Sequence, residues 1–95
     1  MFKNDTGRPI SERAQQEIKA YSSRLSLATN YWVRLTLDDE DCPQFWLMDP
    51  CGDPDGDAWD SFSDLIHDTE DTVKSYEQAI EREMQLGSLT AVDLF

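Results

Sequence analysis

The chain has 95 residues, with eight Lys or Arg against 20 Asp or Glu and a formal net charge of −12. This length predicts a single domain over residues 1–95, with one modest core that needs no covalent staple. The charge argues against binding naked nucleic acid or an anionic membrane, because both are polyanions. Residues 1–10 lack the apolar run of a signal peptide, and no segment approaches the ~20 apolar residues of a membrane span. We therefore expect a cytoplasmic protein.

The first third of the chain predicts a loose arm followed by a helix. Residues 1–9 are expected to be the arm, ending at Gly7 and Pro9. Ser11 is a predicted N-cap. Apolar residues then recur at helical spacing: Ile10, Ala14, Ile18, Tyr21 and Leu25. This period predicts a helix over residues 11–27.

The middle of the chain predicts an antiparallel meander. Residues 31–37 alternate between apolar and mostly polar side chains, and residues 44–49 form a second alternating segment. This is the pattern of half-buried strands. Residues 53–56 predict a turn, because Pro54 presets its φ and Gly56 accepts a positive φ. A short third strand at residues 57–60 would complete the meander.

From Ser61 onward the apolar period is helical. One face collects Phe62, Leu65, Ile66, Thr69, Val73, Tyr76, Ile80 and Met84. The helical period of the apolar residues keeps its phase across residues 67–72. This favours one long helix that spans residues 62–86 rather than two helices recapped near Asp68 or Thr69. Gly87 is the expected stop, and the apolar tail, 88–95, is expected to dock on the domain.

The predicted fold class is thus α+β: an N-terminal helix, a two- or three-stranded antiparallel meander and a long C-terminal helix packed on the sheet. Cys42 and Cys51 flank the second predicted strand, about 30 Å apart. They are expected to be free thiols, since a disulfide needs less than about 7 Å. Trp59 is expected in the core. Trp32 and Trp46 share a face of the hairpin, where Trp46 is a candidate interface anchor.

Thirteen acids and no Lys or Arg lie between Arg34 and Lys74. The same stretch contains enough aromatic and aliphatic residues to fold, unlike a disordered acidic tail. It therefore predicts a one-signed surface for a basic partner. The candidate partner-binding residues are Asp53, Asp55 and Asp57 on the predicted hairpin, Asp60, Asp64, Asp68 and Asp71 toward the predicted helix, and a second patch of Asp38, Asp39, Glu40 and Asp41, together with Trp46.

The alternative to a binding surface is a solvated acidic face that only confers solubility. The absence of Lys partners at i, i+4 spacing favours a functional surface. A calcium loop is a further alternative, with Asp53, Asp55, Asp57, Ser61 and Asp64 at positions 1, 3, 5, 9 and 12. Its position 6 is Ala58 rather than Gly. Zinc-ligand spacing, a phosphate loop and a nucleophile motif are all missing, so we expect no enzyme and no cofactor.

In size, charge and compact folded character the chain resembles the small acidic inhibitors made by phages and mobile elements. These include anti-CRISPR and anti-restriction proteins that mimic nucleic acid. The resemblance implies a non-enzymatic inhibitor of a basic nucleic-acid-binding protein in the host cytoplasm, and it assigns no site residue. The chain is also similar to small acidic immunity proteins that neutralise nuclease toxins. Two alternatives of another class are a small calcium-binding module and an assembly or adaptor protein, with homodimer formation through the long helix or the tail.

Overall fold

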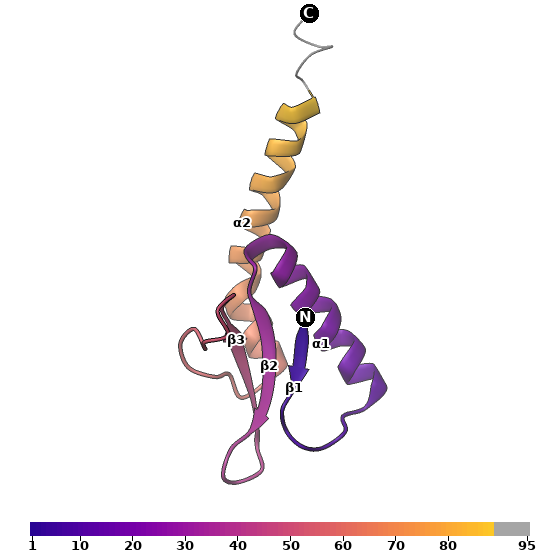
Figure 1. Ribbon diagram of the computed structural model, residues 1–95, viewed down its shortest axis with the longest axis vertical. Helices are drawn as coiled ribbons and strands as arrows, with labels where there is room; N and C mark the ends of the chain where they lie inside the picture. Colours follow the sequence, from indigo (N-terminus) through magenta and orange to yellow (C-terminus); the bar gives the residue numbers. More distant parts are fainter. Residues whose placement is uncertain (89–95) are drawn as a thin grey trace, which may run out of the picture.

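The computed structural model describes residues 1–88, and side chains for residues 1–82. Figure 1 shows the elements in chain order: β1 (Phe2–Asn4), α1 (Glu12–Thr29), β2 (Trp32–Leu37), β3 (Pro43–Met48) and α2 (Phe62–Ser88). The predicted α+β class, with its N-terminal and C-terminal helices, is confirmed. The expected docking of the tail, 88–95, lies outside the side chains described.

The sheet is mixed, so the predicted antiparallel meander is wrong. Its strand order is β1-β2-β3, with β1 parallel and β3 antiparallel to β2. Residues 2–4, expected in a loose arm, pair with residues 33–35. The pairing is parallel because α1 returns the chain to the start of the sheet before β2 begins. Three residues are too few for their alternation to be recognised in the sequence.

A buried serine holds this β1–α1–β2 unit together. The Ser22 hydroxyl, on the inner face of α1, donates a hydrogen bond to the carbonyl oxygen of Met1. It also accepts one from the backbone N–H of Val33 at 2.9 Å. Ser22 is fully buried, and its two bonds join the residue before β1, the helix and the central strand. One polar group thus satisfies backbone groups at both strands.

The helix α1 begins and ends by recognisable capping chemistry. The predicted N-cap is confirmed, because the Ser11 hydroxyl accepts the Ala14 N–H at 3.2 Å. Asn30, with φ 67°, ends the helix in the left-handed conformation, which asparagine tolerates better than most residues. The helix therefore extends two residues beyond its predicted end. The strands β2 and β3 each lie within one residue of their predicted bounds.

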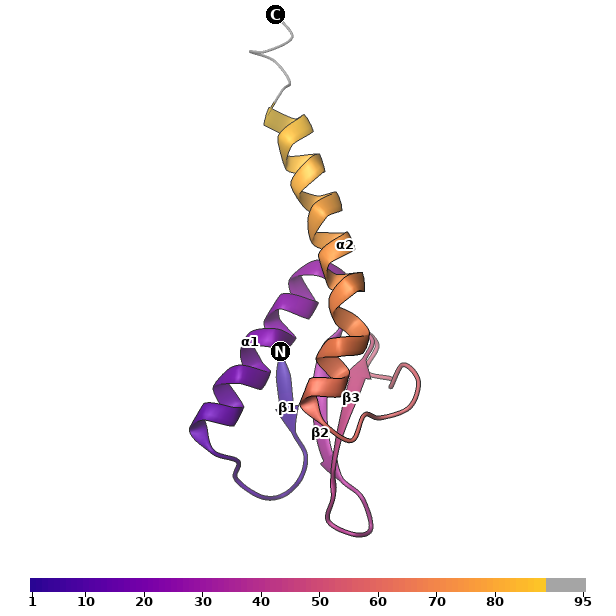
Figure 2. The ribbon, with the colours of Figure 1, turned by 180° about the vertical axis from the view of Figure 1, so that it is seen from behind.

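Both helices cover the same face of the sheet, as Figures 1 and 2 show from opposite sides. On this inner face β2 and β3 pair Val33 with Leu47 and Leu35 with Phe45. The helices supply the buried residues Ile18, Tyr21, Leu25, Leu65 and Val73. The outer face carries the alternate residues, including Trp32, Arg34, Trp46 and Met48, of which Met48 is buried but lies outside the core cluster. Strand period therefore decides which side chains enter the core.

The helix α2 is continuous through residues 67–72, as predicted. Its packed part is nonetheless short. Leu65, Thr69 and Val73 are buried, whereas Tyr76 is 51% and Ile80 39% exposed. Figure 1 shows the rest of α2 projecting past the sheet. The expectation of a long helix packed on the sheet is therefore wrong beyond Val73, because the three short strands leave nothing for it to cover.

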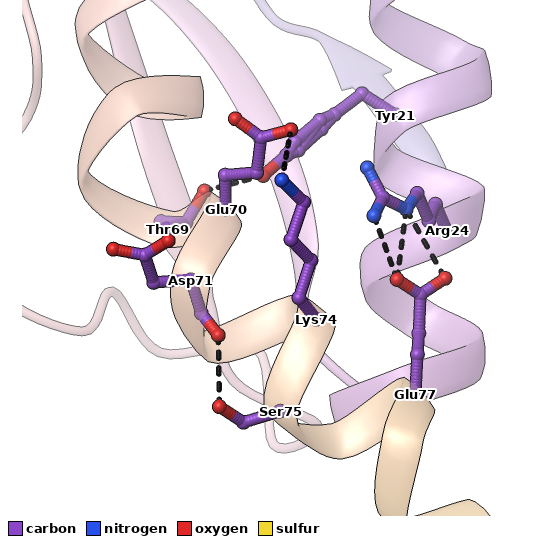
Figure 3. Close-up of polar contacts among 8 residues, drawn as sticks. All are labelled: Tyr21, Arg24, Thr69, Glu70, Asp71, Lys74, Ser75 and Glu77. Carbon is purple, nitrogen blue, oxygen red and sulfur yellow. Dashed lines mark hydrogen bonds and ion pairs between the residues drawn. The ribbon is translucent and has the colours of Figure 1, made fainter. Parts of the chain in front are cut away.

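Within the described side chains, two polar contacts join α1 to α2 (Figure 3). The hydroxyls of Tyr21 and Thr69 share a buried hydrogen bond of 2.7 Å. At the edge of the core, the Arg24 guanidinium contacts both carboxylate oxygens of Glu77, with an Nη2–Oε1 distance of 2.7 Å. Their hydrogen bond raises the pKa of Arg24 and lowers the pKa of Glu77. The second contact lies near the point where α2 leaves the domain.

The hydroxyl pair predicts a coupled effect on stability. Thr69→Val leaves the buried Tyr21 hydroxyl without a partner and should lower the free energy of unfolding by about 1–3 kcal/mol. Tyr21→Phe should cost less, because the Thr69 hydroxyl keeps its bond to the Leu65 carbonyl oxygen at 2.7 Å. Urea unfolding of both single variants and the double variant measures the coupling. Strictly additive costs would contradict it.

The ion pair predicts a stability difference that depends on pH. Because the pKa of Glu77 is lowered in the folded state, its contribution is present above the unfolded-state pKa of about 4.3 and is lost as pH falls through the lower folded value. Glu77→Gln should therefore lower the melting temperature at pH 7, and the difference should vanish in acid. Glu81→Gln, one turn further along α2, is the control. A Glu77→Gln deficit that persists at pH 2 would contradict the assignment.

Candidate partner-binding surface

Residues 53–60, called here the edge segment, run back along the free side of β3. The Asp55 N–H donates to the Leu47 carbonyl oxygen at 2.8 Å, and Phe45 and Trp59 exchange two backbone bonds of 2.9 Å. The only bridges in this segment are Met48 with Pro54 and Phe45 with Trp59. The predicted third strand at 57–60 is therefore wrong, since one bridge at Trp59 is all that forms there.

The edge segment is bulged rather than extended. Its two bridges are five residues apart, from Pro54 to Trp59, whereas their partners on β3 are three apart. Pro54 has no N–H to donate, and Gly56 has φ 79°, a conformation that suits glycine. Three strand steps cover about 10 Å. The exposed acids of the segment, Asp53, Asp55, Asp57 and Asp60, therefore lie closer together along the edge than an extended strand would place them.

The acids of α2 adjoin the edge segment. The Trp59 indole N–H donates to an Asp68 carboxylate oxygen at 2.6 Å and so ties the segment to the helix. Asp64 and Asp71 lie one turn to either side of Asp68, on the same face and exposed. Asp60 precedes the helix rather than belonging to it. We call this combined surface the acidic edge: Asp53, Asp55, Asp57, Asp60, Asp64, Asp68 and Asp71.

The two turns at the ends of β3 are built alike and are closed by aspartates. Asp38 Oδ1 accepts the N–H groups of Glu40 and Cys42 at 2.8 and 2.9 Å. Asp49 Oδ1 accepts those of Cys51 and Asp53, both at 2.9 Å. In each turn the residue three positions after the aspartate has a positive φ: Asp41 at 61° and Gly52 at 89°. Asp38 and Asp49 are thus half-buried structural residues.

The turn predicted at residues 53–56 is wrong in its position. The chain reverses at residues 49–53 instead, where the Gly52 N–H bonds to the Asp49 carbonyl oxygen at 3.0 Å. The sequence carried a signal for this, because each turn starts with Asp and has Pro five positions later, as Asp38–Pro43 and Asp49–Pro54. An aspartate that accepts the N–H two residues on is an established turn former.

The structure separates the remaining candidates from the acidic edge. Within the second patch, Asp41 pairs with Arg8 at 3.2 Å, which leaves Asp39 and Glu40 as its exposed, unbridged acids among the described residues. Trp46 lies on the outer face of the sheet, half-buried, and its indole N–H bonds to the Thr36 hydroxyl at 2.8 Å. Trp46 is therefore turned away from α2. Trp59 packs against the core, as expected.

The positions proposed for a calcium loop do not converge. Within the described part of the chain, no three His, Cys, Asp or Glu residues gather as metal ligands. Ser61 instead caps α2, because its hydroxyl accepts the Asp64 N–H at 3.1 Å. Cys42 and Cys51 are free and exposed in the two turns, as expected.

The structural aspartates predict a stability loss that the exposed acids do not share. Asp38→Ala and Asp49→Ala should each lower the free energy of unfolding by about 1–2 kcal/mol, because two backbone N–H groups lose their acceptor. Asp39→Ala, in the first of the two turns, should stay within about 0.5 kcal/mol of the parent. Chemical denaturation measures all three. Equal stability of Asp49→Ala and Asp39→Ala would refute the structural role.

Among residues 1–88, no helix is both long and apolar enough to cross a membrane. Comparisons of the chain with protein-family models, with curated proteins and with solved structures each find no match. The function is therefore inferred from the acidic edge and from the contacts that hold it.

Proposed function

We propose that the protein is a non-enzymatic inhibitor that occupies the basic nucleic-acid-binding surface of a larger protein. Its acidic edge would present carboxylates where phosphates otherwise lie. Arginine recognises either group through two parallel hydrogen bonds, so the same partner side chains can serve both ligands. Inhibitors of this kind are made by phages and mobile elements, which is the class that the chain resembles in size and charge.

The observation that carries this proposal is the lack of internal cations around the acidic edge. Of the thirteen acids between Arg34 and Lys74, only Asp41 and Glu70 form ion pairs within the described residues. Neither belongs to the acidic edge. Unpaired charges of one sign repel one another and reduce stability. A basic partner would relieve that repulsion on binding and would be drawn to the surface by its long-range field.

The local geometry supports a nucleic-acid mimic over a merely solvated face. The edge segment is held by backbone bonds to β3 and by the Trp59–Asp68 contact. Its charges are therefore presented on a fixed backbone rather than on a mobile tail. The five residue steps from Pro54 to Trp59 span about 10 Å along β3, so residues two positions apart in the segment advance by an average of ~4 Å along the strand. Phosphates along one DNA strand advance by about 3.4 Å.

The proposal is tested by capture and displacement. The immobilised protein is incubated at low salt with a lysate of its native cells, and bound proteins are challenged with double-stranded DNA at constant ionic strength. We expect release of a basic nucleic-acid-binding protein, and weaker capture between about 50 and 200 mM salt. A partner that DNA cannot displace, or capture that is insensitive to salt, would contradict the mimic.

The acidic edge predicts that the position of charge matters more than its total. Asp53→Asn, Asp57→Asn and Asp60→Asn combined should weaken partner binding about tenfold or more, since charge pairs at interfaces contribute about 1.5 kcal/mol or more when close. The matched control combines Glu12→Gln, Glu17→Gln and Glu81→Gln, which removes three charges elsewhere. Titration calorimetry with the captured partner compares them. Equal losses in the two triple variants would assign the effect to net charge alone.

A further inference from the structure

Between α2, the C-terminal end of α1 and the edge segment lies an open cleft of about 370 Å³. Its walls are largely apolar and include three aromatic residues, Tyr31, Trp59 and Tyr76. Leu47 and Val73 belong to the same lining. This volume lies near the lower end of the range for small-ligand sites, and it is large enough to admit a single long side chain.

Two carboxylates belong to this otherwise apolar lining. Asp55 comes from the edge segment, and Asp68 comes from α2. One Asp68 oxygen accepts the Trp59 indole N–H at 2.6 Å, and this bond fixes the carboxylate beside the aromatic wall. Among the described residues that line the cleft there is no Lys, Arg or His. The cleft therefore combines apolar walls with negative charge that no lining cation neutralises.

We propose that this cleft receives an arginine side chain of the basic partner protein. The inference rests on the proposed function and names the contact that gives it specificity. The aliphatic stem of arginine would contact Leu47 and the exposed ring of Tyr76, and its planar guanidinium would meet the aromatic walls and the two carboxylates. Aromatic rings attract cations, and arginine more often than lysine fills such sites. Asp55 belongs to the acidic edge as well, so the cleft opens beside the surface that the partner would cover.

Charge complementarity distinguishes this occupant from others. An apolar peptide would bury the charges of Asp55 and Asp68 without supplying a cation, which is costly. A second copy of this chain would bring another net charge of −12 toward the same surface, and like charges oppose such contact. A cationic side chain with an apolar stem matches both the carboxylates and the apolar walls of the cleft.

The test uses a blocked peptide, acetyl-Gly-Arg-Gly-amide, and the indole N–H resonance of Trp59 in the ¹⁵N-labelled full chain. We expect a saturable shift of this resonance at constant salt. The same peptide with citrulline, which keeps the shape but has no charge, should give little or no shift. Asp55→Asn should weaken binding of the arginine peptide about threefold or more, while Glu12→Gln, an exposed acid outside both the cleft and the acidic edge, should not.

Several outcomes would overturn the cleft assignment. These are equal shifts with arginine and citrulline, equal affinity of the parent and Asp55→Asn, tighter binding of the corresponding lysine peptide, or a Trp59 shift that depends on protein concentration without peptide. The last would assign the cleft to a second copy. If the peptide fails to bind while DNA still displaces a captured partner, only the cleft assignment falls. If the peptide binds and no DNA-displaceable partner is found, the proposed function falls instead.

Discussion

Burial on one side of a small sheet is the constraint on which the rest of this structure depends. Three short strands offer one apolar face, and both helices pack on it. The contacts of Ser22 with Met1 and β2, and of Tyr21 with Thr69, satisfy the polar groups that this packing buries. Within the described side chains, no buried polar side-chain atom lacks a hydrogen-bond partner. The core is thus small, but its buried polar groups are hydrogen-bonded. This matters in a strongly charged chain, because charge repulsion already reduces its stability.

This packing leaves one side of β3 free, and the acidic segment covers it. An uncovered strand edge invites pairing with other chains, and charged residues are a common protection. The bulged segment at residues 53–60 satisfies part of the β3 backbone and turns its aspartates outward. One piece of chain thereby protects the sheet and forms a concentrated negative surface. The two roles are compatible because the backbone of the segment protects the edge of β3, whereas its side chains form the negative surface.

Most of the acids discussed above fall into three physical groups. Asp38 and Asp49 close the turns around β3 and contribute to folding. Five acids are paired with cations: Asp5, Glu17, Asp41, Glu70 and Glu77. The acids of the acidic edge have no ion-pair partner within the described residues, although Asp68 accepts the Trp59 indole. Net charge counts all of these acids alike, whereas the structure distinguishes them by the groups that they contact.

The sequence by itself determined the elements with a strong local period: α1, β2, β3 and the continuous start of α2. Their apolar spacing and the Ser11 cap depend on neighbours within one or two turns, so they can be read along the chain. The tertiary structure alone decided the parallel pairing of β1, the bulge at residues 53–60 and the aromatic cleft. Each depends on residues distant in sequence, such as Phe2 with Val33 or Trp59 with Asp68. The repeated Asp and Pro spacing of the two turns was present in the sequence, but its meaning needed the strand between them. The sequence also showed where the negative charge is concentrated. The fold decided which of those carboxylates are engaged in turns or ion pairs and which are not.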